Sequence, residues 1–475
     1  MHDQTAPVAG YHGRYLQIDL TRQRVVSVPI PQAVFRQFIG GVGLGTWILL
    51  QETDGEYDPL APDAPLVFVF SPLVGSPLTT SAKFAVLCKS PLTHRLNDSL
   101  ASSQFALAGK KTGYDGLLIR GQSPQATCLL IDEDGVRFES ADDVWGLSPA
   151  ATTAALRTRF DRGWRFAAIG TAGENLVRYA TISHDGRHAG RGGSGAVMGA
   201  KRLKAVGVNG QRSPRFADPE QLAAYSKSLS RLSMGPATAK YRELGTVSNL
   251  LTFNRLGTLP TRNFQESTFA GASALAPPVD DAASNRTRSS CAACTIGCEH
   301  IFHAPSQPAG VRLEYESLFA LGSLCGIEDF DTVLKAAALC DEFGMDTISS
   351  GACIAFAMEC TQRGLLDDPE LNFGNNQALL DTLSHIALRR DLGDLLADGT
   401  RMAASRIGGN AADFAPHVKG LEIPGYEPRA LQTMALGFAV NTRGADHNRS
   451  GAYQVDFSDQ VDRLNIDRQA VVLAI

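Results

Sequence analysis

The most informative stretch of the sequence is Cys291-Ala-Ala-Cys294-Thr-Ile-Gly-Cys298, in which three cysteines fall within eight residues. The two residues between Cys291 and Cys294 let their thiolates reach one metal centre. The three residues between Cys294 and Cys298 bring a third thiolate to it. Iron–sulfur clusters are held by such runs, usually with a fourth thiolate from a distant part of the chain. Zinc is an alternative because His300 and His303 follow, although zinc normally pairs such a motif with a second tight pair of ligands. Buried thiols without a ligand role are the third interpretation.

Composition sets the class of protein around this stretch. The chain has 475 residues, 44% hydrophobic and 20% charged, which indicates a globular protein of two or three domains. A net charge of -5 provides no basic field for nucleic acid. The N-terminal residues lack the pattern of a signal peptide, and no apolar run reaches the roughly 20 residues of a membrane helix. We therefore expect a cytoplasmic protein with no membrane segment and no nucleic-acid partner.

Six further cysteines have apolar neighbours and are expected in the core: Cys88, Cys128, Cys325, Cys340, Cys353 and Cys360.

The pattern before and after residue 210 differs. Alternating and short apolar runs predict strands in the first part, whereas helical spacing dominates the second. Expected strands cover 15–20, 66–70, 84–88, 117–120 and 127–131, with helices at about 31–50 and 149–160. Later helices are expected at 218–232, 315–324, 329–343, 347–363, 376–388 and 395–406.

These patterns predict an α+β fold class with a β-rich N-terminal domain followed by mostly α-helical domains. The expected boundaries are 1–210 for the β-rich domain and 211–410 for a helical domain that contains the cysteine run. Residues 411–475 are expected to begin a second helical domain that is incomplete.

A glycine-rich stretch, Ala189–Lys204, interrupts the β-rich part. Its glycines permit close backbone approach, and successive N–H groups can cradle an anion. Arg191, Lys201 and Lys204 are expected to surround it with positive charge. It lacks the ending of a Walker loop and the context of a dinucleotide fingerprint. The two interpretations are a tight turn beside a packed helix and a cradle for a phosphate or another anionic cofactor.

Two carboxylates flank a glycine in Asp341-Glu-Phe-Gly344-Met-Asp346. Gly344 suits the left-handed residue that ends a helix, and Asp346 can cap the next helix. The functional alternative is that both carboxylates accept hydrogen bonds from N–H groups of a bound heterocycle. Elsewhere, Glu316 lies at a helix start, where an acid favours the dipole, and His447 lies in a polar loop as a candidate proton carrier.

Together these stretches resemble the aldehyde:ferredoxin oxidoreductase family, the tungsten-pterin enzymes. The similarity runs along essentially the whole chain in the same order. The resemblance implies an enzyme that oxidises an aldehyde to a carboxylic acid at a tungsten or molybdenum bis-pterin centre. Two electrons would leave through a [4Fe–4S] cluster to ferredoxin or to an iron–sulfur or flavin electron-transfer subunit. The motifs that carry the resemblance include Ile39–Leu44, Gly113–Gly116, Gly190–Gly199, Leu259–Phe264, the cysteine run, Asp341–Asp346 and Arg443–His447.

By position, the resemblance also implies roles for individual residues. Cys291, Cys294 and Cys298 would be three of the four cluster ligands, and Glu316 and His447 would be acid/base groups beside the metal. A homodimer is a candidate assembly, and Mg²⁺ is a candidate ion at the pterin phosphates. The residues implied in pterin and phosphate binding are Lys83, Arg191, Gly192, Gly193, Gly195, Ala196, Asp341, Gly344 and Asp346.

Three features depart from the family pattern. The fourth cluster cysteine and a second pterin motif are expected beyond Val471–Ile475, Lys83 stands where the family often has Arg, and Asp98–Ser103 replaces a segment often rich in glycine. These departures favour an alternative function, that of a degenerate or truncated non-catalytic homologue acting as a scaffold or partner subunit.

Overall fold

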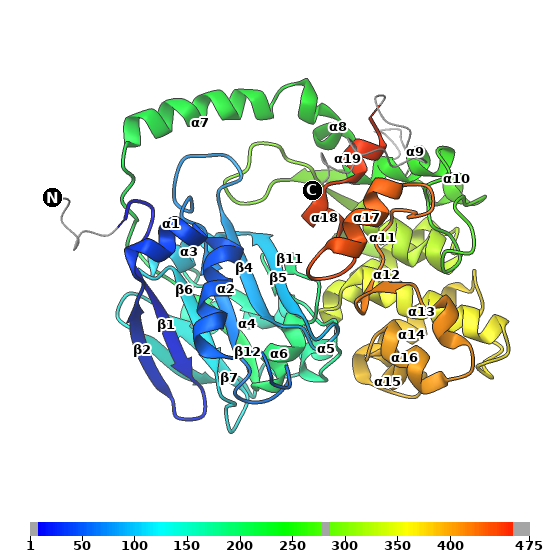
Figure 1. Cartoon of the computed structure of the whole chain (residues 1–475), viewed down its shortest axis with the longest axis horizontal. Coiled ribbons are helices and arrows are strands. Elements are labelled where there is room, and N and C mark those ends of the chain that lie inside the picture. The colour runs from blue at the N-terminus through cyan, green and yellow to red at the C-terminus, as the bar shows by residue number, and fades with distance from the viewer. Residues whose placement is uncertain (1–7, 278–285, 459–475) are drawn as a thin grey trace. The chain divides into compact units, whose positions relative to one another are not determined.

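The computed structural model describes residues 8–277 and 286–458, which fold into two compact units. The first unit contains Met1–Lys240, Ser290–Gly297 and Asp341–Met345, and the second contains the remaining segments. Strands dominate the first and helices the second, so the predicted α+β class is confirmed (Figure 1). The three domain ranges predicted from the sequence stay a prediction.

Two six-stranded sheets form the framework of the first unit. One has the strand order β2-β1-β6-β3-β4-β5 and the other β11-β10-β9-β12-β7-β8. Each contains a single parallel pair, β1 with β6 and β7 with β12, among antiparallel neighbours. The strands of the first sheet are β1 (Arg14–Asp19), β2 (Arg24–Pro29), β3 (Leu66–Phe70), β4 (Lys83–Lys89), β5 (Leu96–Ser102) and β6 (Gly116–Arg120). Those of the second are β7 (Thr127–Ile131), β8 (Val136–Ser140), β9 (Arg165–Ala168), β10 (Ile182–His184), β11 (Arg187–Ala189) and β12 (Leu203–Val208).

Both faces of the sheets are buried, each in a different core. In β3, Phe68 and Phe70 point into a core shared by the two sheets, whereas Val67 and Val69 point to the opposite side. This alternation is the two-residue period of a strand, and burial on both faces explains why β3 reads as one continuous apolar run.

Helices cover the outer faces of the two sheets. The helices α1 (Gln32–Phe38) and α2 (Gly41–Glu52) supply Phe35 and Ile48 to the core outside the first sheet. The sequence predicted one helix there, but Ile39 has a φ of 58° and interrupts it. The other helices of this unit are α3 (Gln104–Lys111), α4 (Pro149–Phe160), α5 (Thr171–Glu174), α6 (Ser194–Ala200) and α7 (Pro219–Ser233), and α8 (Pro236–Leu244) spans the division between units.

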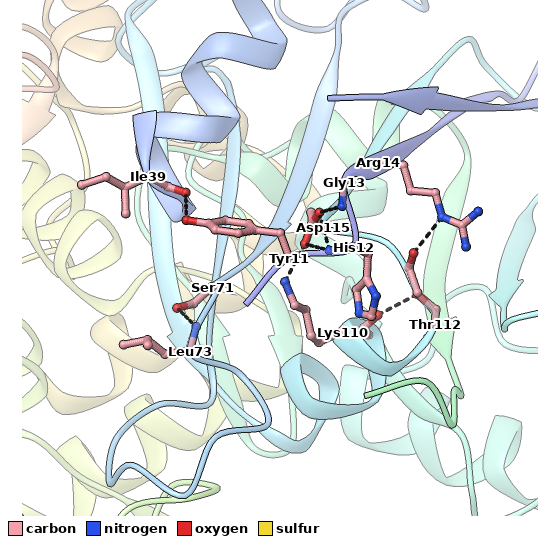
Figure 2. A network of polar contacts seen from close by, with 12 residues as sticks. Tyr11, His12, Gly13, Arg14, Ile39, Ser71, Leu73, Lys110, Thr112 and Asp115 are labelled. Carbon is pink, nitrogen blue, oxygen red and sulfur yellow. Dashed lines mark hydrogen bonds and ion pairs between the residues drawn. The ribbon is translucent and has the colours of Figure 1, made fainter. Parts of the chain in front are cut away.

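A buried ion pair ties the chain before β1 to the first sheet (Figure 2). The Nζ atom of Lys110 lies 2.6 Å from Oδ1 of Asp115, and both side chains are fully buried. The other carboxylate oxygen accepts hydrogen bonds from the backbone N–H groups of His12 and Gly13, at 3.0 and 2.8 Å. Burial lowers the pKa of Lys110, and the Asp115 carboxylate opposes that shift. The pair therefore fixes the start of β1 through charge as well as backbone hydrogen bonds.

The second unit is mostly helical, with two small sheets that the sequence did not predict. One is β13-β14-β15 and the other β16-β17. The helix expected at 395–406 is two helices, because Gly399, with a φ of 86°, separates them. Within the described residues, no helix is both long and apolar enough to cross a membrane.

The strands of the second unit are β13 (Arg286–Ser289), β14 (Glu299–Ala304), β15 (Gln307–Arg312), β16 (His417–Val418) and β17 (Leu421–Glu422). The helices are α9 (Asn249–Arg255), α10 (Ala272–Leu275), α11 (Tyr315–Leu321), α12 (Phe330–Phe343), α13 (Thr347–Gln362), α14 (Asn376–Leu388), α15 (Leu392–Leu396), α16 (Thr400–Ile407), α17 (Gln432–Val440), α18 (His447–Ser450) and α19 (Tyr453–Asp456), of which α12 crosses from the second unit into the first.

Candidate functional site

The first part of the cysteine run is a loop of the first unit that packs against the segment before β4. The Thr295 N–H donates to Oγ1 of Thr79 at 2.9 Å, and the two hydroxyl oxygens are 2.8 Å apart. Ala293 and Gly297 have φ values of 52° and 66°, so the loop turns sharply at both positions. Cys291 and Cys294 belong to this unit, whereas Cys298 belongs to the second.

The surroundings of Cys294 favour its thiolate form. A hydrogen bond with Cys291, two backbone N–H groups and the charge of Lys83 lower the pKa of the Cys294 thiol to about 5 against the effect of burial. The thiolate is the form of cysteine that binds metals, so a low pKa suits a cluster ligand. Lys83 thus places a positive charge near this thiolate.

The other cysteines divide as expected from the sequence. All six that the sequence placed in the core are buried. Among the described residues, no three His, Cys, Asp or Glu side chains gather closely enough to hold a single metal ion. The thiolates of an iron–sulfur cluster bind different irons rather than one ion. The assignment of Cys291, Cys294 and Cys298 to a cluster therefore stays a prediction.

The glycine-rich stretch forms a tight turn that leads into α6. Gly192 and Gly193 have φ values of 87° and 80°. A Cβ on Gly192 would lie 2.0 Å from Oδ1 of Asn97, and one on Gly193 would lie 2.0 Å from the carbonyl oxygen of Arg178. Neither position can carry a side chain without moving the backbone or its neighbour. The stretch therefore forms a tight turn that leads into a packed helix, and its role as a cradle for an anion stays a prediction.

Two of the N–H groups that the sequence offered to an anion are used inside the fold. Gly195 donates to the carbonyl oxygen of Ala180 at 2.9 Å, and Ala196 donates to that of Gly193 at 3.1 Å. The Arg191 carbonyl accepts a hydrogen bond from Oγ of Ser99 at 2.8 Å, which fixes the start of the turn against β5.

The expectation that two lysines surround this stretch with positive charge was wrong. Lys201 is fully buried and donates to the carbonyl oxygen of Pro62 at 2.8 Å. Lys204 is fully buried as well and pairs with Glu174. Both ammonium groups are directed into the core, because the chain turns into the buried strand β12 at this point. Of the three expected cations, Arg191 is therefore the one that stays a candidate contact for an anionic cofactor.

Two buried polar atoms next to this turn have no hydrogen-bond partner among the described residues. They are Oγ of Ser194, which is 0% exposed, and Nδ2 of Asn97, which is 2% exposed. An unsatisfied buried donor costs about 1–3 kcal/mol, so such groups usually have a partner. A bound group rich in acceptor oxygens, such as a phosphate, would satisfy both atoms. The turn therefore fits an anionic cofactor through these side chains rather than through the N–H groups that the sequence suggested.

The structure shows helix-cap roles for two residues of the Asp341–Asp346 segment. Gly344, with a φ of 73°, follows the end of α12. Asp346 is the N-cap of α13, where its carboxylate accepts hydrogen bonds from the N–H of Ile348 at 3.2 Å and from Oγ of Ser349 at 2.9 Å. A role of Gly344 or Asp346 in cofactor binding stays a prediction.

Asp341 has a different partner, which the sequence did not reveal. Its Oδ1 atom lies 2.8 Å from Nε2 of His188, and Nδ1 of that imidazole lies 2.8 Å from Oγ of Ser183. Ser183 and His188 are paired residues of the β10–β11 hairpin. Its turn, Asp185-Gly186, has positive φ at both residues and is a known hairpin signal. That dipeptide could have predicted the hairpin, but not its contact with Asp341.

One stretch of chain holds both of these segments. The carbonyl oxygen of Ala180 accepts the hydrogen bond from Gly195 of the glycine-rich turn. The next residue, Thr181, donates its N–H to the carbonyl oxygen of Gly344 at 2.8 Å. A bridge between Ala180 and Met345 completes this attachment. The turn at 191–196 and the segment 341–345 therefore lie next to each other in the first unit.

Glu316 and His447 come together in the second unit. Oε1 of Glu316, on α11, lies 3.6 Å from Nε2 of His447, the first residue of α18, and their side chains are only 16% and 13% exposed. The N–H of Gly425 donates to Oε2 of Glu316 at 3.0 Å. The Tyr426 ring stacks on the imidazole with centroids 5.2 Å apart. The 3.6 Å separation is longer than a direct hydrogen bond, so a proton would pass between the carboxylate and the imidazole through one bridging water. The sequence named both residues but missed Gly425 and Tyr426, which position them.

Two family models match almost the whole chain. "Aldehyde ferredoxin oxidoreductase, N-terminal domain" matches residues 15–210, and "Aldehyde ferredoxin oxidoreductase, domains 2 & 3" matches residues 223–475. The tungsten-containing aldehyde ferredoxin oxidoreductase of Thermococcus kodakarensis is 35% identical over 448 residues, which cover 92% of this chain and 74% of that protein. The aliphatic sulfonate oxidoreductase, WOR-like subunit, of Pyrococcus furiosus is 30% identical over 475 residues, which cover 93% of this chain and 76% of that protein.

A solved structure has the same fold. The active site complex BamBC of benzoyl coenzyme A reductase, in complex with 1,5 dienoyl-CoA, matches with a TM-score of 0.79 and 27% sequence identity. The match covers 91% of this chain and 70% of that chain. The chain therefore shares its fold with part of a benzoyl coenzyme A reductase, an enzyme named for a different reaction from that of the relatives above.

Proposed function

The chain belongs to the aldehyde ferredoxin oxidoreductase family, and we propose from this that it oxidises an aldehyde to a carboxylic acid. The proposed centre is a tungsten or molybdenum bis-pterin. A [4Fe–4S] cluster, when bound, would carry the two electrons to ferredoxin or to an electron-transfer subunit. Water supplies the added oxygen atom, and two protons are released together with the two electrons.

The observation that carries the proposal is the pair formed by Glu316 and His447. The oxidation releases protons, so the site needs a group that accepts them. Glu316 is held by the Gly425 N–H at one oxygen, which leaves the other oxygen facing Nε2 of His447. Stacking on Tyr426 fixes the plane of the imidazole. In this proposal Glu316 takes a proton from water or from the hydrated aldehyde, and His447 donates a hydrogen bond to the developing oxyanion.

The residues proposed to contact the pterins lie in the first unit, as do two of the three proposed cluster cysteines. When bound, the tungsten-pterin group supplies the two-electron chemistry, and the protein supplies orientation and charge. We propose that Arg191, Ser194 and Asn97 contact its phosphates, because the last two offer buried atoms without partners among the described residues. Asp341 is the proposed acceptor for a pterin N–H group. Cys291, Cys294 and Cys298 are the proposed cluster ligands, and Cys294 is favoured by its lowered pKa.

The proposed partners are an aldehyde and ferredoxin or an iron–sulfur or flavin electron-transfer subunit. A cytoplasmic location, a homodimer and Mg²⁺ at the pterin phosphates stay predictions of the sequence.

The test is a metal analysis of anaerobically purified protein combined with an activity assay. We expect about four irons per chain, the content of one [4Fe–4S] cluster, together with one tungsten or molybdenum and two pterins. Aldehydes of different size should reduce a viologen dye under anaerobic conditions, and the carboxylic acid should appear in equal amount to the aldehyde consumed.

Two results would contradict the proposal. A cooperatively folded protein without tungsten, molybdenum or pterin would favour the non-catalytic alternative. A protein with the full cofactor set that reduces the dye with an alkanesulfonate, and with none of the aldehydes, would replace the substrate class while leaving the centre in place.

A further inference from the structure

We propose that His188 is a positioning residue that fixes the Asp341 carboxylate for hydrogen bonding to a bound pterin. The inference rests on the proposed function, since it assumes that a pterin binds beside the segment 341–345. It goes beyond that function by giving a role to the β10–β11 hairpin, which carries none of the residues that the sequence implied.

Helix capping does not account for Asp341. The residue lies in the last turn of α12, which ends at Phe343. The C-terminal end of a helix carries partial negative charge, so a carboxylate there is unfavourable by a few tenths of a kcal/mol to about 1 kcal/mol. Gly344 and Asp346, in contrast, occupy positions where capping favours their residue types. A carboxylate at an unfavourable position points to another role.

Contacts at Nδ1 of His188 fix the orientation of the ring that contacts Asp341 through Nε2. It pairs with Ser183 across the hairpin, and Thr181 lies two residues earlier on the same face. The hydroxyl oxygens of Ser183 and Thr181 lie 2.8 and 3.1 Å from Nδ1 of His188. These two hydroxyls fix the ring orientation, so that Nε2 faces Oδ1 of Asp341 at 2.8 Å.

The arrangement also sets the tautomer that the contact needs. Asp341 accepts at Oδ1, so Nε2 of His188 carries the proton. Nδ1 then accepts a hydrogen bond from a hydroxyl group, and both Ser183 and Thr181 can supply one. A neutral imidazole is therefore sufficient, as for histidines whose second nitrogen is fixed by a neighbouring group.

The contact leaves Asp341 able to bind a ligand. Its side chain is 39% exposed, whereas that of His188 is 14% exposed. The hydrogen bond to His188 uses Oδ1, and a carboxylate has acceptor capacity at both oxygens. The backbone fixes the geometry further, because Thr181 of the same hairpin donates to Gly344. Asp341 is thus oriented from one side by His188 and accessible from the other.

The test compares His188→Ala with His188→Gln in protein expressed and purified anaerobically. Gln keeps an N–H donor near the position of Nε2, whereas Ala removes it. His385→Ala is the matched control, since His385 lies in α14 of the second unit, outside the proposed site and away from the cysteine run. We would measure pterin, tungsten and iron per chain, the rate of pterin loss during dialysis, and the unfolding midpoint of each variant in urea.

We expect His188→Ala to lose pterin and tungsten about 10-fold faster than wild type, in line with the loss of other groups that orient a ligand. Iron content and the unfolding midpoint should stay close to wild type, and His188→Gln should recover most of the retention. Equal pterin retention in wild type and His188→Ala would overturn the inference and leave the proposed function intact. Failure of His188→Gln to restore pterin retention would also overturn the inference. So would a loss of iron and of stability in His188→Ala together with the loss of pterin. A wild-type protein that contains no pterin would overturn both.

Discussion

Replacing Asp115 by Asn should destabilise the first unit strongly and in a way that depends on pH. The substitution leaves the ammonium of Lys110 fully buried without its counter-charge. It also converts the carboxylate that accepts hydrogen bonds from the N–H groups of His12 and Gly13 into a neutral amide, which has only one acceptor oxygen. Breaking a buried ion pair from one side typically costs about 3–5 kcal/mol, because an uncompensated charge stays buried.

The free energy needed to deprotonate Lys110 is an upper limit to this destabilisation. Lys110 can release its proton, and neutralising a lysine of ordinary pKa at pH 7 costs about 4.6 kcal/mol. Burial already lowers the pKa of Lys110, and Asp115 opposes the shift, so the pKa falls further in the variant. Above neutral pH the folded variant then holds one proton fewer than folded wild type. The destabilisation should therefore shrink by about 1.4 kcal/mol per pH unit until the wild-type lysine also loses its proton.

Lys110→Met is the informative comparison. In that variant the carboxylate of Asp115 keeps the two backbone N–H donors of His12 and Gly13. Hydrogen bonds to a charged acceptor contribute about 1.5–3 kcal/mol each, so Asp115 tolerates the loss of its partner better than Lys110 does. We expect the free energy of unfolding to fall less than in Asp115→Asn, and its difference from wild type should stay constant with pH as long as Lys110 of folded wild type keeps its proton.

Tryptophan fluorescence during urea unfolding measures the free energy of unfolding of the first unit, which contains Lys110 and Asp115. The three tryptophans, Trp47, Trp145 and Trp164, all lie in the first unit. If Asp115→Asn and Lys110→Met cost the same, and neither cost changes with pH, the reasoning from an uncompensated buried lysine is refuted.

Three further predictions use the same preparations. Glu316→Gln should lower aldehyde-dependent dye reduction by a factor of about 10²–10⁴ with unchanged tungsten and pterin content, and retained activity would remove Glu316 from the mechanism. Burial lowers the pKa of Lys201 to about 7, whereas the unfolded chain keeps that proton to about pH 10.4. The wild-type free energy of unfolding should therefore rise between pH 7 and 10, and Lys201→Met should flatten this rise, as urea midpoints at pH 7, 8.5 and 10 would show. Gly344→Ala should lower that free energy by about 1–3 kcal/mol, since its Cβ would lie 3.0 Å from the Gly170 nitrogen at a φ of 73°. Gly186→Ala, with a φ of 69° and open space around the Cβ, is its control, and an equal loss in the two variants would show that the contact contributes nothing.

The sequence predicted elements best where the signal is local. The strands at 66–70 and 127–131 and the helices at 149–160 and 376–388 have the bounds found in the structure. Each is a short apolar run or a periodic segment bounded by turn residues or caps, so its pattern is contained within the element. The same local signals identified Asp346 as an N-cap.

What the sequence missed depends on contacts between distant residues. The parallel pairing of β1 with β6 joins segments that no local pattern relates. The directions of Lys201 and Lys204 follow from the burial of β12 between β7 and β9, which charge patterning alone cannot reveal. In the candidate site, the sequence named Glu316, His447 and Asp341 but not His188. The contacts of Glu316 with His447 and of Asp341 with His188 form only through the fold.

The two aspartates of the segment Asp341–Asp346 are therefore not equivalent, although a pattern of paired carboxylates treats them alike. Asp346 is 7% exposed, and its carboxylate is engaged at the start of α13 by Ile348 and Ser349. Asp341 is held from the side by an imidazole and stays accessible. A ligand that approached Asp346 would have to compete with a helix cap, whereas the carboxylate of Asp341 is already oriented. Of the two, Asp341 is for this reason the stronger candidate for direct cofactor contact.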